Sequence, residues 1–125
     1  MRKTFVKTIQ KFSNEHLILQ FFHNLDKNER ANFIEIYNIQ EDPQNKFNLN
    51  VEMEFQSKTL EQMFTEKKIV DGKKCFADIF WVLFFMEKNK MIHQDVHLKN
   101  ILFNSKKKKF YLIDFGLGKF LKTIN

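Results

Sequence analysis

Alternating hydrophobic and polar positions mark three stretches of the chain, and each alternation predicts a β-strand. The stretches cover residues 4–9, 33–39 and 47–55. Residues 40–46 separate the second stretch from the third, and Pro43 with its polar neighbours is typical of a turn. We therefore expect one strand near the N-terminus and a β-hairpin later in the chain.

The interval after the first strand carries apolar residues at helical spacing. The spacing predicts a helix over residues 14–25, preceded by Ser13. Serine is a favourable N-cap because its hydroxyl accepts a hydrogen bond from a backbone N–H of the first turn. The residues expected to face the core are Leu17, Ile18, Phe21, Phe22 and Leu25.

Two further helices are predicted after the hairpin. Thr59 is a suitable N-cap for a short helix, and Asp71-Gly72 interrupts the chain before a longer helix over residues 74–88. We expect this longer helix to be buried on most sides, because its apolar residues leave little polar face. These residues are Phe76, Ile79, Phe80, Leu83 and Phe84.

A second, smaller hairpin is predicted near the C-terminus. Residues 101–103 and 110–113 are short β-prone runs, and four lysines at 106–109 lie between them. A solvated turn is the simplest interpretation of these lysines. The pattern as a whole predicts the α+β fold class.

Composition limits the class of protein. A chain of 125 residues with 43% hydrophobic and 29% charged residues fits one globular domain with a single core. Cys75 is the only cysteine and lies in an apolar run, which favours a packed core residue in a reducing, cytoplasmic compartment. The longest apolar run is far shorter than the roughly 20 residues that cross a bilayer, so we expect no membrane span.

The net charge of +6 raises the question of an anionic partner. A nucleic-acid patch is the alternative interpretation of the lysines at 106–109. Aromatic residues are not interleaved with the basic ones, as they would be on a surface that stacks bases. We therefore do not expect a nucleic-acid partner.

The residues with the clearest chemistry lie in two short segments. The first reads Met-Ile-His-Gln-Asp-Val-His-Leu-Lys-Asn over residues 91–100, and the second reads Leu-Ile-Asp-Phe-Gly over residues 112–116. Together they resemble the catalytic loop H-R-D-L-x-x-x-N and the D-F-G motif of the protein kinase superfamily. Six identities match: His93, Asp95, Asn100, Asp114, Phe115 and Gly116.

This resemblance implies phosphoryl transfer from ATP with Mg²⁺ as cofactor. Magnesium prefers hard oxygen ligands, and the predicted metal ligands are Asn100 and Asp114. Asp95 is the candidate that orients the acceptor hydroxyl and takes its proton. The predicted catalytic set consists of Asp95, Asn100, Lys99 and His93.

The third strand and the short helix after it resemble the hinge region of a kinase. On that interpretation Met53 guards the back of the nucleotide pocket, and backbone groups around Glu54 and Phe55 hydrogen-bond the adenine. The alternative is a plain amphipathic strand.

The resemblance also assigns the phosphate-binding pair of a kinase. Lys7 on the first strand is the candidate for the α- and β-phosphates, and Glu15 on the next helix is its ion-pair partner. Their separation in sequence is short for the family, so Lys3 is a rival. The alternative is that the lysine and the glutamate are ordinary surface residues.

Other parts of the kinase pattern are missing from this sequence. No glycine-rich loop precedes Lys7, and only a short stretch follows Gly116. We expect a partial kinase-like domain, with a reduced N-terminal sheet over residues 1–53 and a truncated helical C-terminal lobe over residues 54–125. His97 stands where many serine/threonine kinases carry a lysine, which is similar to small-molecule kinases; a hydrogen bond within the loop is the alternative.

Three functions remain open at this point. The first is an ATP-dependent phosphotransferase acting on protein serine or threonine hydroxyls. The second is a kinase-like binding module with impaired catalysis, and the third is a small-molecule kinase of the aminoglycoside or lipopolysaccharide-kinase type. The expected partners are a protein substrate or a kinase, and a truncated domain with sixteen Phe could also dimerise through exposed apolar surface.

Overall fold

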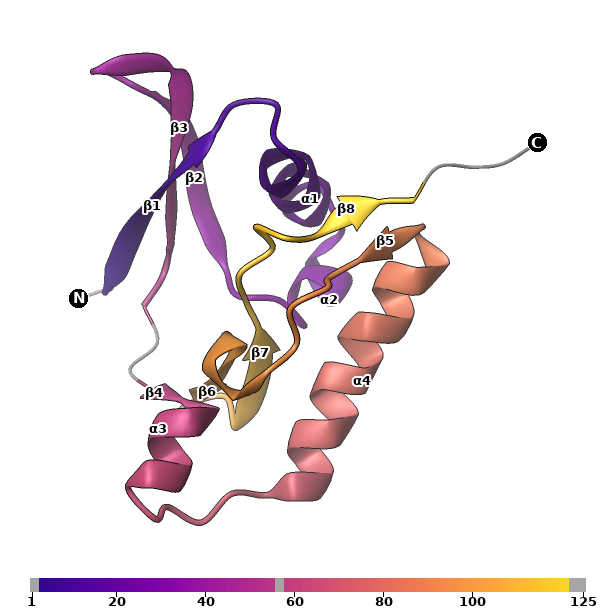
Figure 1. Ribbon diagram of the computed structural model, residues 1–125. Coiled ribbons are helices and arrows are strands. Elements are labelled where there is room, and N and C mark those ends of the chain that lie inside the picture. The colour runs from indigo at the N-terminus through magenta and orange to yellow at the C-terminus, as the bar shows by residue number, and fades with distance from the viewer. Residues whose placement is uncertain (1–2, 56–57, 122–125) are drawn as a thin grey trace.

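A computed structural model describes residues 3–55 and 58–121 of the chain. A three-stranded antiparallel sheet forms the N-terminal part, with the helix over residues 14–23 beside it. The longest helix, over residues 72–88, and two small sheets belong to the rest (Figure 1). The predicted α+β class is confirmed.

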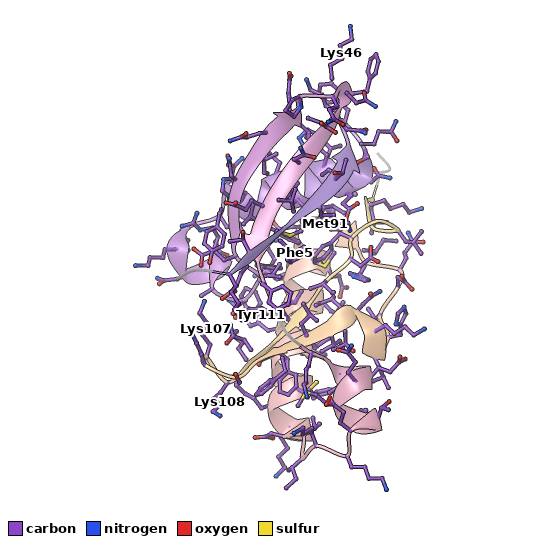
Figure 2. All side chains as sticks on the ribbon, turned by 90° about the vertical axis from the view of Figure 1, so that its left-hand side faces the viewer. Phe5, Lys46, Met91, Lys107, Lys108 and Tyr111 are labelled. Atoms are coloured by element: carbon purple, nitrogen blue, oxygen red, sulfur yellow. The ribbon has the colours of Figure 1, made fainter. Side chains whose placement is uncertain are left out.

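The N-terminal sheet has the order β1-β3-β2. The predicted hairpin is present, and its tip projects from the body of the molecule with Lys46 at the end (Figure 2). The second strand was expected from residue 33 but begins at Ile36, because Phe33 and Ile34 leave the sheet and are buried in the core. The strands are β1 (Thr4–Gln10), β2 (Ile36–Asp42) and β3 (Asn45–Glu54).

Helix α1 (Asn14–His23) begins as predicted, and Oγ of its N-cap Ser13 accepts a hydrogen bond from the backbone N–H of His16. The buried residues of α1 are Ile18, Leu19 and Phe22. The assignment of Leu17 to the core is wrong, since Leu17 is 44% exposed. The helix is rotated so that Leu19 faces inward instead. A short helix that the pattern did not predict, α2 (Lys27–Arg30), follows.

The C-terminal part contains both predicted helices. Thr59 caps the short helix in a capping box with Gln62, and Asp71 caps the long one by accepting a hydrogen bond from the N–H of Lys74. The helices are α3 (Leu60–Thr65) and α4 (Gly72–Lys88).

The predicted small hairpin is also confirmed, as β6 (Ile101–Asn104) and β7 (Lys109–Leu112). Strand β4 (Lys58–Thr59) joins it on the far side of β6. A separate pair, β5 (Met91–Ile92) and β8 (Lys119–Phe120), and the 3₁₀ helix η1 (Leu98–Asn100) complete the structure.

Helix α4 is buried on one face only, so the expectation of burial on most sides is wrong. Phe76, Phe80 and Phe84 are 69%, 55% and 54% exposed. They stack along the helix, with ring centroids 5.6 Å apart for the first pair and 6.3 Å for the second. The opposite face carries the buried residues Asp78, Ile79, Val82, Phe85 and Met86.

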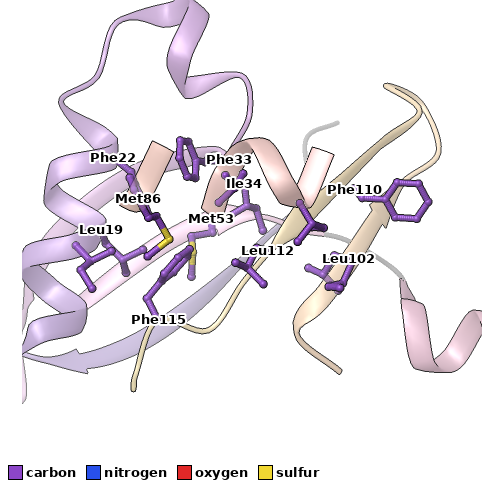
Figure 3. Close-up of a cluster of buried hydrophobic side chains, with 14 of the residues drawn as sticks. Leu19, Phe22, Phe33, Ile34, Met53, Met86, Leu102, Phe110, Leu112 and Phe115 are labelled. Atoms are coloured by element: carbon purple, nitrogen blue, oxygen red, sulfur yellow. The ribbon is translucent and has the colours of Figure 1, made fainter. Parts of the chain in front are cut away.

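One hydrophobic cluster connects the N-terminal and C-terminal parts (Figure 3). It joins Leu19 and Phe22 of α1, Met53 of β3, Met86 of α4 and Leu112 of β7. Because the cluster crosses from the sheet to the helices, it fixes the loops that lie between them. The predicted division at residues 53 and 54 stays a prediction. No helix in the described part of the chain has both the length and the apolar character to cross a bilayer.

Candidate active site

A cavity of about 230 Å³ opens between the N-terminal sheet, α1 and the segment after β7. Its three charged residues, Lys7, Glu15 and Asp114, come from three separate segments, and the rest of the wall is mostly apolar. The site therefore combines an apolar interior with a few polar groups that point into it, as ligand sites usually do. Its lining residues are Phe5, Lys7, Glu15, Leu19, Ile34, Met53, Asn100, Ile113, Asp114 and Phe115.

Lys7 and Glu15 form an ion pair across this cavity. Alternation along β1 places Phe5 and Lys7 on the same face of the sheet. Glu15 lies in the first turn of α1, where a carboxylate also interacts favourably with the helix dipole. Nζ of Lys7 is 3.7 Å from Oδ1 of Asp114 as well, so one ammonium group faces two carboxylates.

The rival lysine is placed elsewhere. Lys3 is exposed and does not line the cavity. Its backbone carbonyl accepts a hydrogen bond from the N–H of Phe55 at 3.1 Å, which ties the start of β1 to the end of β3. The structure brings Lys7, and not Lys3, to the other charged residues.

Asp114 begins a tight, strained turn. Its φ of 60° is left-handed, and its Oδ1 accepts a hydrogen bond from the N–H of Gly116 at 3.2 Å. Phe115 is 3% exposed and packs edge-on against Phe22 and His93, with ring centroids 5.0 and 5.1 Å away. The buried ring anchors the turn, and the Asp114 carboxylate remains accessible.

His93 joins the two segments that carry the motif. Its Nε2 lies 2.8 Å from the carbonyl oxygen of Ile113, and its Nδ1 accepts a hydrogen bond from the N–H of Asp95 at 3.1 Å. These partners fit a neutral ring with the proton on Nε2. Since His93 is 3% exposed and does not line the cavity, the geometry makes it a residue that positions Asp95 rather than one that contacts substrate.

Asn100 is buried, and its two ends have different partners. Its Nδ2 donates to the carbonyl oxygen and to Oδ2 of Asp95, at 2.9 and 3.1 Å. Its backbone carbonyl accepts a hydrogen bond from the N–H of Ile113 at 2.8 Å. The amide is therefore oriented with its nitrogen toward Asp95, which leaves Oδ1 as the group available to a ligand.

Asp95 is surrounded by groups of its own loop. Nε2 of His97 lies 3.2 Å from its Oδ1, and Nδ1 of His97 accepts a hydrogen bond from the N–H of Lys99 at 3.2 Å. A neutral histidine whose Nδ1 accepts carries its proton on Nε2, and this Nε2 lies beside Oδ1 of Asp95 and 3.3 Å from Nδ2 of Asn100. The interpretation of His97 as a residue bonded within the loop fits this geometry.

Lys99 does not reach the cavity. It is exposed, in η1, next to the buried Asn100. Adjacent residues of a helical turn point in different directions, so burial of Asn100 turns Lys99 toward solvent. Lys99 is therefore not among the charged residues that line the cavity.

The hinge residues differ from one another in their relation to the cavity. Met53 lines it, whereas Glu54 and Phe55 do not. The N–H of Glu54 donates to the carbonyl of Glu35, and the N–H of Phe55 donates to that of Lys3. Both N–H groups therefore already have backbone partners.

The donor set at the cavity suits a divalent cation shared with phosphates. Within residues 3–55 and 58–121, no group of three or more His, Cys, Asp or Glu side chains could hold a metal by itself. Mg²⁺ typically takes one or two protein carboxylates and completes its shell with water and substrate phosphates. The Asp114 carboxylate and Oδ1 of Asn100, on one cavity wall, fit that requirement.

Of the apolar wall, the sequence pattern identified Met53 and Phe115 but not Phe5, Leu19 or Ile34. Phe5 could have been found from its position two residues before Lys7 on a strand. Ile34 and Leu19 could not, because their placement depends on how α1 and the start of β2 pack. These apolar residues decide which flat or apolar groups the cavity accepts.

The comparisons with known proteins agree with this geometry. The sequence matches the family described as the protein kinase domain over residues 2–125. Among solved structures, the kinase PK-1 of Cydia pomonella granulovirus has a similar fold, with a TM-score of 0.70 at 24% sequence identity. The match covers 95% of this chain and 44% of the viral protein, so this chain spans less than half of that protein's length. The kinase-like fold expected from the two motifs is confirmed.

Proposed function

The chain belongs to the protein kinase family, and on that basis we propose that it binds ATP in the cavity described above and transfers its γ-phosphoryl group to a hydroxyl. One observation carries the proposal: Lys7, Glu15, Asn100 and Asp114, from four separate segments, line a single cavity. If Asp114 were an ordinary loop aspartate, we would not expect Lys7, its partner Glu15 and the buried Asn100 to lie at the same cavity. In protein kinases the ion pair and the aspartate of the D-F-G motif must both be in position for transfer.

The binding half of the proposal assigns roles to the cavity wall. Lys7 contacts the α- and β-phosphates, while Glu15 holds the lysine side chain in place. Phe5 and Met53 supply apolar contacts for the base, because both line the same cavity as the ion pair. Asn100 and Asp114 would hold Mg²⁺, which would neutralise charge on the β- and γ-phosphates.

For the transfer of the γ-phosphoryl group, we assign the role of proton acceptor to Asp95. The acceptor hydroxyl forms a new bond to the γ-phosphorus as the bond from that phosphorus to the β,γ-bridging oxygen breaks and ADP leaves. The carboxylate of Asp95 accepts the proton of the hydroxyl. His93 and Asn100 hold Asp95 in one orientation through hydrogen bonds of 3.1 Å each, and Nε2 of His97 lies 3.2 Å from its Oδ1.

For the acceptor, we propose serine or threonine side chains of proteins. The support is the match of residues 2–125 to the protein kinase domain. The alternative, a small-molecule acceptor, depended on His97, and His97 already has a partner in Asp95. Acceptor profiling with a generic basic protein and with an aminoglycoside would separate the two.

The experiment that tests the proposal is a titration of the purified chain with ATP, with and without Mg²⁺. The proposal requires saturable, magnesium-dependent binding that Asp114→Ala abolishes, followed by transfer of labelled γ-phosphate to an acceptor. Lys108→Ala is a matched control, because Lys108 is exposed and remote from the cavity. Absence of binding at millimolar ATP would overturn the assignment.

A second candidate function is supported by the exposed aromatic face of α4. Phe76, Phe80 and Phe84 form a continuous stacked row, which is costly in water and typical of an interaction surface. On this proposal the chain is a binding module that docks a kinase partner or a second copy of itself. Sedimentation of the wild type and of Phe80→Lys would test self-association: a concentration-dependent dimer lost in the variant supports it, and a monomer in both removes it.

A further inference from the structure

A second cavity, of about 200 Å³, lies on the other side of Ile34 from the site described above. It is enclosed by the end of α1, by α2, by the segment that leads into β2 and by the β6–β7 turn. We name it the basic pocket, and its lining residues are Phe22, His23, Lys27, Arg30, Ala31, Phe33, Ile34, Glu35, Ile36 and Lys107.

The floor of the basic pocket is apolar and its rim is charged. Phe22, Phe33 and Ile34 are buried, and the two rings stack with centroids 4.0 Å apart. Lys27, Arg30 and Lys107 are exposed, against a single carboxylate from Glu35. A molecule that fits must therefore combine a small apolar body with a negative head group.

The rim cations are available to a ligand. Among the residues that the structure describes, neither Lys27 nor Arg30 takes part in an ion pair, and Nζ of Lys107 is 3.9 Å from the nearest carboxylate oxygen, on Glu54. Figure 2 shows Lys107 on the β6–β7 turn, which closes the basic pocket from the C-terminal side. Three cations from two distant parts of the chain therefore converge on one opening.

His23 lies in the wall of the basic pocket, at the end of α1. Its Nδ1 is buried and has no hydrogen-bond partner among the described residues. Because this nitrogen has almost no accessible surface, a head group in the basic pocket does not contact it. The ring is instead a nearby reporter of an occupant.

We propose that the basic pocket binds a small organic anion, a phosphate monoester or a carboxylate with an aromatic or branched apolar body. Arg30 is placed to hold the head group, because a guanidinium pairs with phosphate or carboxylate through two parallel hydrogen bonds. Lys27 and Lys107 add charge, and the stacked pair Phe22 and Phe33 contacts the apolar body.

The basic pocket and the nucleotide cavity share Ile34 but no charged residue. Variants can therefore separate the two sites. Binding of an anion at the basic pocket does not depend on the proposed kinase activity, and Lys7→Gln is the variant that distinguishes the sites.

The test uses phenyl phosphate as the probe and benzyl alcohol as its neutral control, with the full chain and proton–carbon NMR of the histidine rings. We expect saturable binding of phenyl phosphate that shifts the His23 ring signal, and no shift with benzyl alcohol at the same concentration. Arg30→Gln should weaken binding on the order of tenfold, as expected for loss of one charge-assisted pair. Lys107→Gln should weaken it roughly threefold, and Glu35→Gln should strengthen it roughly threefold, because each changes one rim charge.

Lys108→Gln is the matched control, since Lys108 lies in the same turn as Lys107 but outside the basic pocket. It should leave the affinity unchanged, as should Lys7→Gln. All of these side chains are on the surface or partly exposed, so the variants should fold. Three results would overturn the proposal: no saturation at millimolar probe, equal losses for Arg30→Gln and Lys108→Gln, or loss of binding in Lys7→Gln, which would place the probe in the nucleotide cavity.

Discussion

The ammonium group of Lys7 lies 3.7 Å from Oδ1 of Asp114, although the two residues come from opposite ends of the chain. Lys7 belongs to the first strand, and Asp114 follows the last strand of the small C-terminal sheet. Their approach brings the N-terminal sheet and the two motif segments to one cavity.

Replacing Lys7 by methionine should weaken ATP binding on the order of tenfold or more, because the phosphates lose a cation and Glu15 loses its partner. Lys3→Met is the control, since Lys3 is an exposed lysine outside the cavity. Calorimetric titration with ATP and Mg²⁺ measures both. Equal affinities of the two variants would mean that Lys7 has no special role.

Replacing Asp95 by asparagine should separate transfer from binding. The rate of transfer should fall by about 10²–10⁴-fold, because the variant cannot accept the hydroxyl proton, while ATP affinity changes little. Single-turnover transfer and equilibrium binding are the two measurements. A variant that lost nucleotide affinity and kept its transfer rate would contradict the role of Asp95.

Gly118 has no room for a side chain. A Cβ there would lie 2.9 Å from Cδ1 of Ile18 and 3.0 Å from the carbonyl oxygen of Ile92. Gly118→Ala should therefore lower the free energy of unfolding by about 1–3 kcal/mol, as overpacking usually does. Gly72→Ala, with nothing within 4 Å, should be neutral or stabilising by up to about 1 kcal/mol. Urea denaturation of the pair checks this, and similar stabilities would refute it.

Asp78 holds the edge of the small C-terminal sheet. Its Oδ2 accepts a hydrogen bond from the buried N–H of Phe110 at 2.9 Å, and its Oδ1 pairs with Lys74 at 2.7 Å. Asp78→Ala leaves that N–H unsatisfied and should cost about 1–3 kcal/mol of stability. Asp78→Asn keeps an oxygen acceptor and should cost less. If thermal denaturation showed equal losses of stability for Asp78→Ala and Asp78→Asn, the ion pair with Lys74, and not the hydrogen bond from Phe110, would be the stabilising contact.

Tyr111 should make the fold sensitive to high pH. Burial raises the pKa of its hydroxyl to about 12, the Glu54 carboxylate adds to the rise, and a hydrogen bond with Asn104 opposes it. The folded state then holds this proton more tightly than the unfolded state, whose pKa is about 10. Stability is unaffected below about pH 10 and falls as the pH rises toward about 12.

The free energy of unfolding should fall by roughly 2–3 kcal/mol, because the pKa of Tyr111 differs by about two units between the folded and the unfolded state. Tyr111→Phe should lack this component, so the difference between wild type and variant isolates it from the titration of the lysines. Urea denaturation at a series of pH values between about 9 and 12 measures both. Parallel curves for the two proteins would show that Tyr111 does not contribute.

The sequence by itself determined the local elements and the chemistry of the two motif segments. The period of the apolar residues located the strands of the N-terminal sheet, the small hairpin and helices α1 and α4, and Ser13 and Thr59 marked helix N-caps that the structure bears out. Asp71-Gly72 was expected to interrupt the chain, but Asp71 is the N-cap of α4 and Gly72 is its first residue. These features depend on residues within a few positions of one another. They can be derived from the chain because the forces that set them are local.

Only the tertiary structure decided which side of each element is used. It turned Leu19 rather than Leu17 inward, left Phe80 on the surface, and placed Lys7 and not Lys3 beside Asp114. It also enclosed His93, so that both ring nitrogens serve the backbone. These outcomes depend on contacts between segments far apart in sequence, and the rotation of a helix or the pairing of a two-residue strand is fixed only when the whole core is packed.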